Sequence, residues 1–478
     1  MFALTLKAIA DAAKGTYFGP EELLNVKPSG IVTDSRKVEK NCIYAAIKGE
    51  RNDGHDFIKN SIENGALCAI AERKSEEGGS DFSDCPYILV KDTGDALRSI
   101  AELFRLYIDA KVIGITGSVG KTSTKETIAC VLSQKFKLHK TEGNFNNQLG
   151  VPLTIFGTEE DDEVLVMEMG VSHFGDMDVI GKICRPDISV ITNIADCHLE
   201  NLITRDGVLK EKTEIFKWMP KHGKAILNGD DEKLSTIEDI RGVEKYFCGI
   251  RNEFIPDNAE QPDFVASEIT SLGLDGVECT IYGPGEWQNG FRVRIPVPGR
   301  HMVHNAVIAC AVAYQFDLST DEIIKGLSTL TSMSGRGQII NTAKYRIFND
   351  CYNANPASMN AALNVLKMAE GRKVAVLGDM FELGENKEEL HKGVGYIATC
   401  TETDVLVCIG SLAKNYEKGA IEGTLETGKA PEIYCFDTKE DFISQMDMII
   451  KEGDTILVKA SHGMHLEKVV EAIQNEAS

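Results

Sequence analysis

The chain has 478 residues, of which 43% are hydrophobic and 26% charged, an ordinary globular balance that suits roughly three domains. Its 51 Lys and Arg against 73 Asp and Glu give a formal net charge of −22. Such a surface repels phosphate-rich polymers and anionic lipid, so we expect neither nucleic acid nor a membrane as a partner. No cysteine spacing indicates a metal site or a disulfide framework, and no apolar run is long enough to span a membrane. We therefore expect a soluble cytoplasmic protein. We also expect a monomer, although these features do not determine the oligomeric state.

The first unit, residues 1–109, is expected to be a small N-terminal α/β domain. It opens with an amphipathic helix, MFALTLKAIADAAKG, which lacks the basic start of a signal peptide. Short strands are expected at IVTDSR, CIYAAIKG, ALCAIAE and YILVKD, and the helix DALRSIAELFRLYID closes the unit. A hinge is expected near residues 109–110.

Two further α/β units follow. In residues 110–330 the strands KVIGIT, EVLVMEMG, DISVITNI and KAILNGDD alternate with helices, which predicts a largely parallel sheet covered by helices. The period-two pattern of residues 263–282 and of FRVRIPVPG predicts an antiparallel insertion. Residues 331–478 alternate again, through YRIFND, KVAVLGDM, DVLVCIG and DTILVKAS, as in a Rossmann-like domain. The fold class is therefore three-domain α/β.

The strongest motif is GITGSVGKTS, between an apolar strand and a helix. It predicts a phosphate loop in which backbone amides surround phosphate oxygens, Lys121 reaches the β- and γ-phosphates, and the Thr122 hydroxyl binds Mg²⁺. Ile115 stands where the general pattern has Gly, and the alternative is an ordinary strand-to-helix turn. The loop alone does not identify the reaction. The predicted phosphate-binding residues are Gly117, Ser118, Val119, Gly120, Lys121, Thr122 and Ser123.

Glu168, His198 and Lys212 of the same unit are candidates for catalysis. Glu168 ends an apolar strand, where a carboxylate is costly unless it binds a metal or is otherwise paired. A metal ligand and a helix-capping or salt-bridged Glu are both open. An isolated histidine such as His198 is more often a structural residue than a metal ligand. Lys210 and Lys212 are two residues apart and therefore do not share a helix face. Their sequence context alone predicts an exposed surface position for both.

The third unit offers residues at the carboxyl ends of strands, where α/β sheets bind ligands. Asp350 ends the strand YRIFND, and Arg336 in SGRG could donate to a phosphate or simply be solvated. In the turn CYNANP, Asn355 can cap the next helix and Pro356 suits its first position. The last strand ends in residues 459–463, KASHG.

With these residues the sequence resembles the Mur ligase family along essentially its whole length. The order and spacing of the motifs make a chance match very improbable. The motifs are TDSR at 33–36, KGERNDGHDF at 48–57, TGSVGKTSTKE at 116–126, GNFNNQLGVPLT at 143–154, MEMGVSHFGD at 167–176, HLENL at 198–202, LNGDD at 227–231, GRHMVHNA at 299–306, DCYNANPASM at 350–359 and VLGDMFELGE at 376–385.

The resemblance implies an ATP-dependent, ADP-forming amide ligase of peptidoglycan precursor synthesis. ATP would phosphorylate an acceptor carboxylate, and an amine would then attack the acyl phosphate. DCYNANPASM and VLGDMFELGE imply UDP-N-acetylmuramoyl tripeptide as the acceptor and D-Ala-D-Ala as the amine. Two alternatives remain: the neighbouring ligase that adds the third amino acid, and a P-loop NTPase that is not a ligase.

The resemblance also implies roles for single residues. Domain one would bind the UDP end, domain two ATP and two Mg²⁺ ions, and domain three the incoming amine, with closure about residues 109–110 and 326–336. Lys212 would be carbamylated and reach a metal, which reverses the surface interpretation. The catalytic residues would be Lys121, Glu168, His198, Lys212 and Arg336; the metal ligands Thr122, Glu168, His198 and Lys212; the further nucleotide contacts Asn228, Asn305, Arg336 and Asp350; the substrate contacts Ser35, Arg36, Asn144, Asn146, Asn147, Asn353, Asn355 and Ser461.

Two positions depart from the family pattern. The closing loop usually reads KGSR, and here it is KASH at residues 459–462. His462 in place of Arg puts in doubt a direct Arg contact to a substrate carboxylate. Cys42 stands where Gly is common, which concerns only the geometry of a turn.

Overall fold

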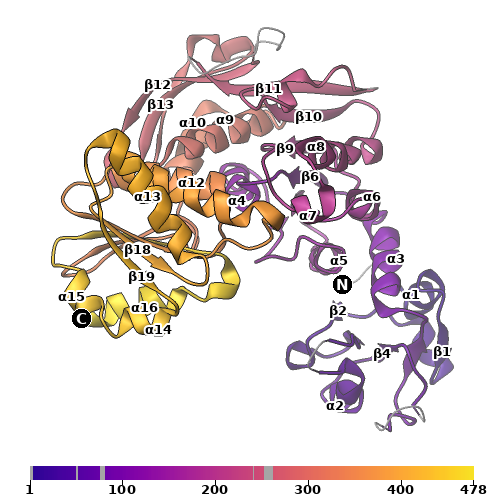
Figure 1. Ribbon diagram of the computed structural model, residues 1–478. Coiled ribbons are helices and arrows are strands. Elements are labelled where there is room, and N and C mark those ends of the chain that lie inside the picture. The colour runs from indigo at the N-terminus through magenta and orange to yellow at the C-terminus, as the bar shows by residue number, and fades with distance from the viewer. Residues whose placement is uncertain (1–3, 50–51, 76–80, 241, 252–261, 478) are drawn as a thin grey trace.

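The computed structural model describes residues 4–49, 52–75, 81–240, 242–251 and 262–477, and its strands form three sheets. Each sheet is the centre of one lobe, and the three lobes follow one another along the chain (Figure 1). We call them the N-terminal, central and C-terminal lobes. The predicted three-domain α/β class is confirmed.

The N-terminal lobe has five strands in the order β1-β5-β4-β3-β2. One expected strand is shorter than predicted, because IVTDSR is extended only at Ile31–Val32. The Asp34 carboxylate then accepts a hydrogen bond from the backbone N–H of Arg36, 3.0 Å away, and turns the chain into a short 3₁₀ helix. The elements are α1 (Leu6–Ala12), β1 (Thr16–Phe18), β2 (Ile31–Val32), β3 (Ile43–Ala45), α2 (Ile58–Glu63), β4 (Cys68–Ala71), β5 (Tyr87–Leu89) and α3 (Thr93–Arg105).

The central lobe has nine strands in the order β14-β13-β12-β11-β10-β9-β6-β8-β7. Strands β6 to β12 pair in parallel, whereas β12, β13 and β14 pair antiparallel, so the predicted insertion is confirmed. Strand bounds are β6 (Lys111–Thr116), β7 (Leu138–Lys140), β8 (Val164–Glu168), β9 (Ile188–Ile191), β10 (Gly223–Asn228), β11 (Val243–Ile250), β12 (Phe264–Ser271), β13 (Val277–Tyr282) and β14 (Phe291–Ile295). The helices include α4 (Lys121–Leu132), α5 (Gly150–Phe156), α6 (Asp176–Cys184), α7 (Leu199–Leu202), α8 (Arg205–Thr213), α9 (Arg300–Tyr314) and α10 (Thr320–Ser328).

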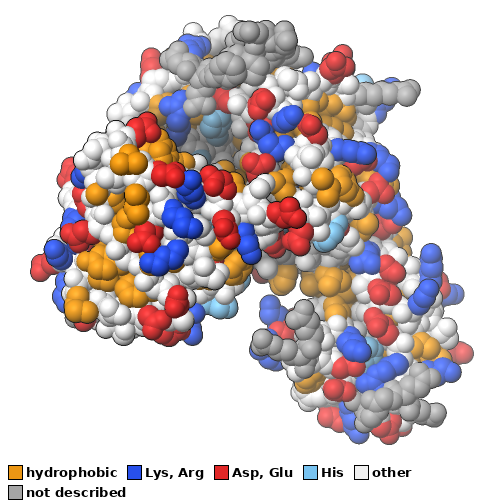
Figure 2. Space-filling model, viewed as in Figure 1, with side chains coloured by type: hydrophobic (Ala, Val, Ile, Leu, Met, Phe, Trp, Pro, Cys, Tyr) orange, Lys and Arg blue, Asp and Glu red, His pale blue; other side chains and the backbone are white. Residues whose placement is uncertain are grey.

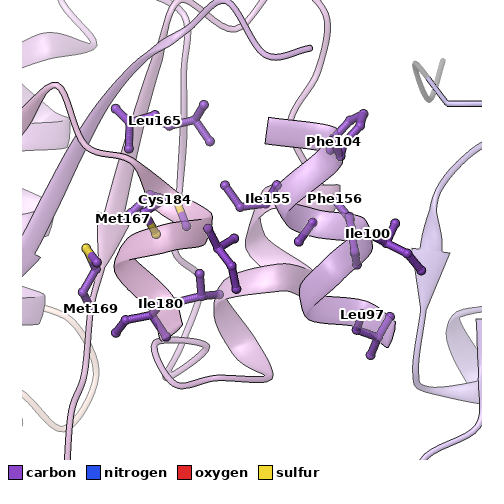
Figure 3. Close-up of a cluster of buried hydrophobic side chains, with 14 of the residues drawn as sticks. Leu97, Ile100, Phe104, Ile155, Phe156, Leu165, Met167, Met169, Ile180 and Cys184 are labelled. Atoms are coloured by element: carbon purple, nitrogen blue, oxygen red, sulfur yellow. The ribbon is translucent and has the colours of Figure 1, made fainter. Parts of the chain in front are cut away.

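Both faces of the central sheet are covered, because side chains alternate along its strands. On β8, Val164 and Val166 pack into the core that contains α4 and α9, and Leu165 and Met167 pack into the opposite core. That second core continues into the N-terminal lobe, since α3 lies against α5 and α6 (Figure 3). Helix α3 therefore anchors the N-terminal lobe on the central one. The side chains labelled there are Leu97, Ile100, Phe104, Ile155, Phe156, Leu165, Met167, Met169, Ile180 and Cys184.

The C-terminal lobe has six strands in the order β15-β16-β20-β17-β18-β19, all parallel except β15. The tip of the β12–β13 hairpin reaches it from the central lobe: Leu274 is buried in its core, and Asp275 pairs with Arg346. Its elements include β15 (Gln338–Asn341), β16 (Arg346–Asn349), α11 (Pro356–Lys367), β17 (Lys373–Gly378), α12 (Lys387–Cys400), β18 (Val405–Ile409), α13 (Ala413–Thr427), β19 (Glu432–Phe436), β20 (Thr455–Lys459) and α16 (Glu467–Glu476).

Acidic and basic side chains are interspersed over the face in Figure 2, and a notch separates the N-terminal lobe from the C-terminal lobe. In the part of the chain that the structure describes, none of the helices combines the length and the apolar character that crossing a bilayer requires.

Candidate active site

A cavity of about 990 Å³ lies between the central and C-terminal lobes. It is lined by the phosphate loop and the carboxyl ends of the central strands on one side, and by the loops around β16 and β20 on the other. Most of the predicted site residues therefore meet in one place. Those that line it are Ser118, Val119, Gly120, Lys121, Thr122, Ser123, Asn144, Asn146, Asn147, Glu168, His198, Asn228, Asn305, Arg336, Asp350, Asn353 and Asn355.

The phosphate loop has the geometry that its glycines predict. Gly117 has φ +147°, and a Cβ at this position would lie 1.9 Å from Thr192 Oγ1, so no side chain fits. Gly120 has φ +84° and precedes α4 without a side-chain cap. The first N–H groups of a helix have no partner within the helix, which makes this end suited to an anion. Lys121 folds over the loop, and its Nζ donates to the carbonyl of Gly117 at 2.8 Å.

Two residues that the sequence analysis missed hold this loop in shape. The Asn193 side chain accepts from the N–H of Val119 and donates to its carbonyl, both at 2.9 Å. Thr192 Oγ1 donates to the same carbonyl at 2.6 Å. Both residues follow β9, so their polar side chains directly after the apolar run of DISVITNI were a signal that could have found them.

Glu168 is the centre of the candidate metal site. Its side chain is buried, and its two carboxylate oxygens accept hydrogen bonds of 2.8 Å from Thr122 Oγ1 and Asn146 Nδ2. Both donors are neutral, and no Lys, Arg or His among the described residues pairs with this carboxylate. Glu168 is therefore neither a helix cap nor part of a salt bridge, the two structural interpretations that the sequence left open. A buried, uncompensated carboxylate beside a hydroxyl fits a hard divalent cation such as Mg²⁺.

Lys212 is buried, so the surface interpretation of its sequence context is wrong; for Lys210, which is exposed, it is right. The buried residues of helix α8 are Val208, Glu211 and Lys212. Burial is the main reason that the pKa of Lys212 falls to about 7, and the positive charge of Lys121 lowers it further. Within the described chain no carboxylate pairs with its Nζ. A buried amine that is partly neutral fits a reaction with CO₂ to a carbamate.

His198 lies at the rim of the cavity, in the left-handed backbone region with φ +51°. Its Nδ1 is 3.1 Å from the carboxylate of Glu382, which belongs to the loop after β17 in the C-terminal lobe. Burial lowers the pKa of His198, against the opposing effect of Glu382. The imidazole is thus disposed toward its neutral form, which is the form that binds a metal.

The C-terminal lobe brings Arg336 and Asp350 to the same cavity. Asp350 accepts at one oxygen from the N–H of Gly337 at 3.0 Å and at the other from Lys459 Nζ at 2.6 Å. The Arg336 guanidinium lies over the ring of Tyr352, 3.8 Å from the centroid. Lys459 and Tyr352 were not among the predicted site residues.

Several predicted residues have structural partners or lie elsewhere. Asn355 caps the start of α11, as the sequence predicts, and the Asn147 side chain accepts from the N–H of Gly150, the first residue of α5, at 2.9 Å. Gly117, Lys212 and Ser461 do not line the cavity, and Ser461 Oγ accepts from the N–H of Phe381 at 2.8 Å.

Asn228 and Asn305 line the cavity but are also bonded to the protein. Asn228 Nδ2 donates to the Thr192 carbonyl at 2.9 Å, and Asn305 Oδ1 accepts from Thr124 Oγ1 at 3.0 Å. Ser35 and Arg36 belong to the N-terminal lobe and are not brought to the cavity; Arg36 pairs with Asp34 and its side chain is 87% exposed.

Comparison with known proteins agrees with this architecture. The Mur ligase family, catalytic domain, matches residues 27–105, the Mur ligase middle domain matches residues 115–313, and the Mur ligase, glutamate ligase domain, matches residues 335–462. In Bacillus subtilis (strain 168), a UDP-N-acetylmuramoyl-tripeptide–D-alanyl-D-alanine ligase is 34% identical, and the match covers 98% of this chain and 98% of that protein.

Solved structures give the same result. A crystal structure of MurF from Acinetobacter baumannii is 30% identical, with a TM-score of 0.85 and 98% of each chain covered. MurF ligase from Thermotoga maritima in complex with ADP is 29% identical, with a TM-score of 0.78, covering 94% of this chain and 97% of that chain. The chain belongs to the Mur ligase family.

Proposed function

We propose that this chain is an ATP-dependent ligase that adds D-Ala-D-Ala to UDP-N-acetylmuramoyl tripeptide in peptidoglycan precursor synthesis, releasing ADP and phosphate. The observation that carries the proposal is the shared cavity. A phosphate loop from one lobe and an arginine and an aspartate from another line the same space. The full-length similarity to the Bacillus subtilis ligase names the substrates.

The reaction replaces a poor electrophile by a good one. A carboxylate oxygen of the tripeptide attacks the γ-phosphorus of ATP, the bond to the β-bridging oxygen breaks, and ADP leaves. The amine of D-Ala-D-Ala then attacks the acyl carbon, loses a proton, and expels inorganic phosphate. The charge on the transferred phosphoryl group is spread over its oxygens, and Lys121 and Arg336 would stabilise it.

The metal assignment rests on the oxygen and nitrogen atoms that the site offers as ligands. Thr122, Glu168 and His198 would hold Mg²⁺, and the burial of Lys212 without a carboxylate supports a carbamate that adds a further oxygen ligand. Bound Mg²⁺ supplies charge neutralisation at the phosphates.

The remaining site residues divide between substrates. Asn228 and Asn305 would contact the adenosine part of ATP, and Asp350 its ribose. Ser35 and Arg36 would contact the uridine end of the acceptor. Asn144, Asn146 and Asn147 would contact its peptide end. Asn353, Asn355 and Ser461 would bind the incoming amine substrate.

An omission assay with product mass tests the proposal. Phosphate release should require ATP, Mg²⁺, the UDP-linked tripeptide and D-Ala-D-Ala together, and the product should gain the mass of D-Ala-D-Ala less water. Ligation of a single diamino acid to the dipeptide precursor would instead identify the neighbouring ligase. Phosphate release without any carboxylate substrate would identify a P-loop NTPase that is not a ligase.

A further inference from the structure

Three flat groups lie together at the C-terminal wall of the cavity. The guanidinium carbon of Arg336 is 3.8 Å from the ring centroid of Tyr352. The ring of His462 stacks on the same tyrosine, with centroids 5.3 Å apart and planes 29° apart. Arg336 and Tyr352 both line the cavity, whereas His462, an exposed residue of the loop after β20, does not.

The backbone on both sides of Arg336 is hydrogen-bonded to the segment that carries Tyr352. The carbonyl of Gly335 accepts from the N–H of Tyr352 at 3.0 Å. The N–H of Gly337 donates to Asp350 Oδ1, also at 3.0 Å. Gly335 and Gly337 have φ near +70°, a conformation that favours glycine. The arginine is thus held by its two neighbours, and only its side chain needs a further support.

The tyrosine ring supplies that support without using the donors of the guanidinium. An arginine stacked on an aromatic ring is held by its face, and its N–H groups at the edge remain able to bind phosphate oxygens. No carboxylate pairs with Arg336 among the described residues. A carboxylate partner would compete with a phosphate for the same N–H groups, and a ring does not.

We propose that Tyr352 is a positioning residue that orients the Arg336 guanidinium toward the terminal phosphate of ATP, and that His462 supports Tyr352 by stacking on its ring. This inference rests on the proposed function, in which Arg336 meets the γ-phosphoryl group. It also assigns a role to His462, which stands where the family usually has Arg: its ring packs against that of Tyr352.

Steady-state ligation separates a positioning role from a structural one. Tyr352→Leu should lower kcat by about tenfold, a factor between those of an exposed and a desolvated cation–π contact, while the Kd for ADP stays within about twofold. Tyr352→Phe keeps the ring and should restore activity to within about twofold of wild type. His462→Ala should have a smaller effect than Tyr352→Leu. Tyr434→Leu, at a half-buried tyrosine on β19 outside the cavity, is the matched control.

A double-mutant cycle tests whether Tyr352 acts through Arg336. In the Arg336→Ala background, Tyr352→Leu should cause no further loss of kcat. If the two effects multiply, or if Tyr352→Phe is as impaired as Tyr352→Leu, the positioning role is refuted.

A binding measurement keeps the inference testable apart from the proposed reaction. Isothermal titration gives the preference of each variant for the non-hydrolysable analogue AMPPNP over ADP, which reports on the terminal phosphate alone. Tyr352→Leu should reduce this preference to that of Arg336→Ala. An unchanged preference refutes the inference even where ligation proceeds, whereas absence of ligation by the wild type refutes the proposed function and leaves this ratio measurable.

Discussion

Replacing Lys212 by Met should stabilise the protein at neutral pH while abolishing ligation. Lys212 is buried, and its pKa falls from 10.5 to about 7. At about 1.36 kcal/mol for each pKa unit, charging this amine in the folded state costs ~4–5 kcal/mol relative to water. Met has a similar length and no charge, so Lys212→Met should raise the free energy of unfolding at pH 7 by ~2–4 kcal/mol, since relaxation and water penetration reduce the full value.

The sign of the pH dependence follows from linkage. Between the folded pKa of about 7 and the unfolded value near 10.4, the unfolded chain binds more protons at Lys212 than the folded chain. The stability of the wild type should therefore rise relative to that of Lys212→Met as pH increases through this window. The difference between the two proteins should be largest at pH 7 and small near pH 10.

Tryptophan fluorescence during urea unfolding is the assay, because both tryptophans, Trp218 and Trp287, lie in the central lobe. The buffer must be free of CO₂, since carbamylation would relieve part of the cost. Lys210→Met, on the exposed side of the same helix, is the control and should change stability by less than about 0.5 kcal/mol. If Lys212→Met is as stable as the wild type or less so at pH 7, the reasoning about the buried amine is wrong.

Three further predictions follow from other parts of the chain. Ile203→Gly should raise the thermal midpoint by about 1–2 °C, because a β-branched residue with φ +66° is strained by about 1 kcal/mol or more, and calorimetry measures the change. Leu274→Ala should lower the free energy of unfolding by ~2–4 kcal/mol in urea, whereas Asp275→Asn, which loses only its exposed pair with Arg346, should lose less than about 1 kcal/mol. Lys459→Met removes the cation 2.6 Å from Asp350, and titration with ADP should show about tenfold weaker binding.

Structural features that one continuous segment of the chain forms could be predicted from the sequence. The phosphate loop is such a feature, because strand, glycines, Lys121 and helix follow each other without interruption. The alternation of strands and helices likewise predicted three α/β lobes, and the period-two pattern predicted the antiparallel pairing of β12 to β14. Each of these depends on local backbone chemistry and on one repeating burial pattern.

The side of a helix that is buried could not be predicted where that side is polar. On α8 the buried face consists of Val208, Glu211 and Lys212, which has helical spacing but only one apolar member. Glu211 is buried because its carboxylate accepts the backbone N–H groups of Gly175 and Met177, at 2.9 and 2.7 Å, at the start of α6. These partners come from a distant part of the chain, and hydrophobic periodicity carries no information about them. For Asn193, the position directly after β9 marks a candidate residue, but only the fold shows that its partner is Val119.

If His198 is a metal ligand, its contact with Glu382 would link metal binding to the approach of the two lobes. The 3.1 Å pair uses Nδ1 of the imidazole, and one ring nitrogen cannot hold a carboxylate and a metal at once. If His198 binds Mg²⁺ through Nδ1, Glu382 must leave, and the C-terminal lobe loses one of its contacts to the central lobe. Leu274 and the pair between Asp275 and Arg346 lie on the hairpin tip and are untouched by that exchange. The hairpin would then keep the two lobes joined while the loop after β17 moves, so metal binding and lobe movement would share His198 as their common residue.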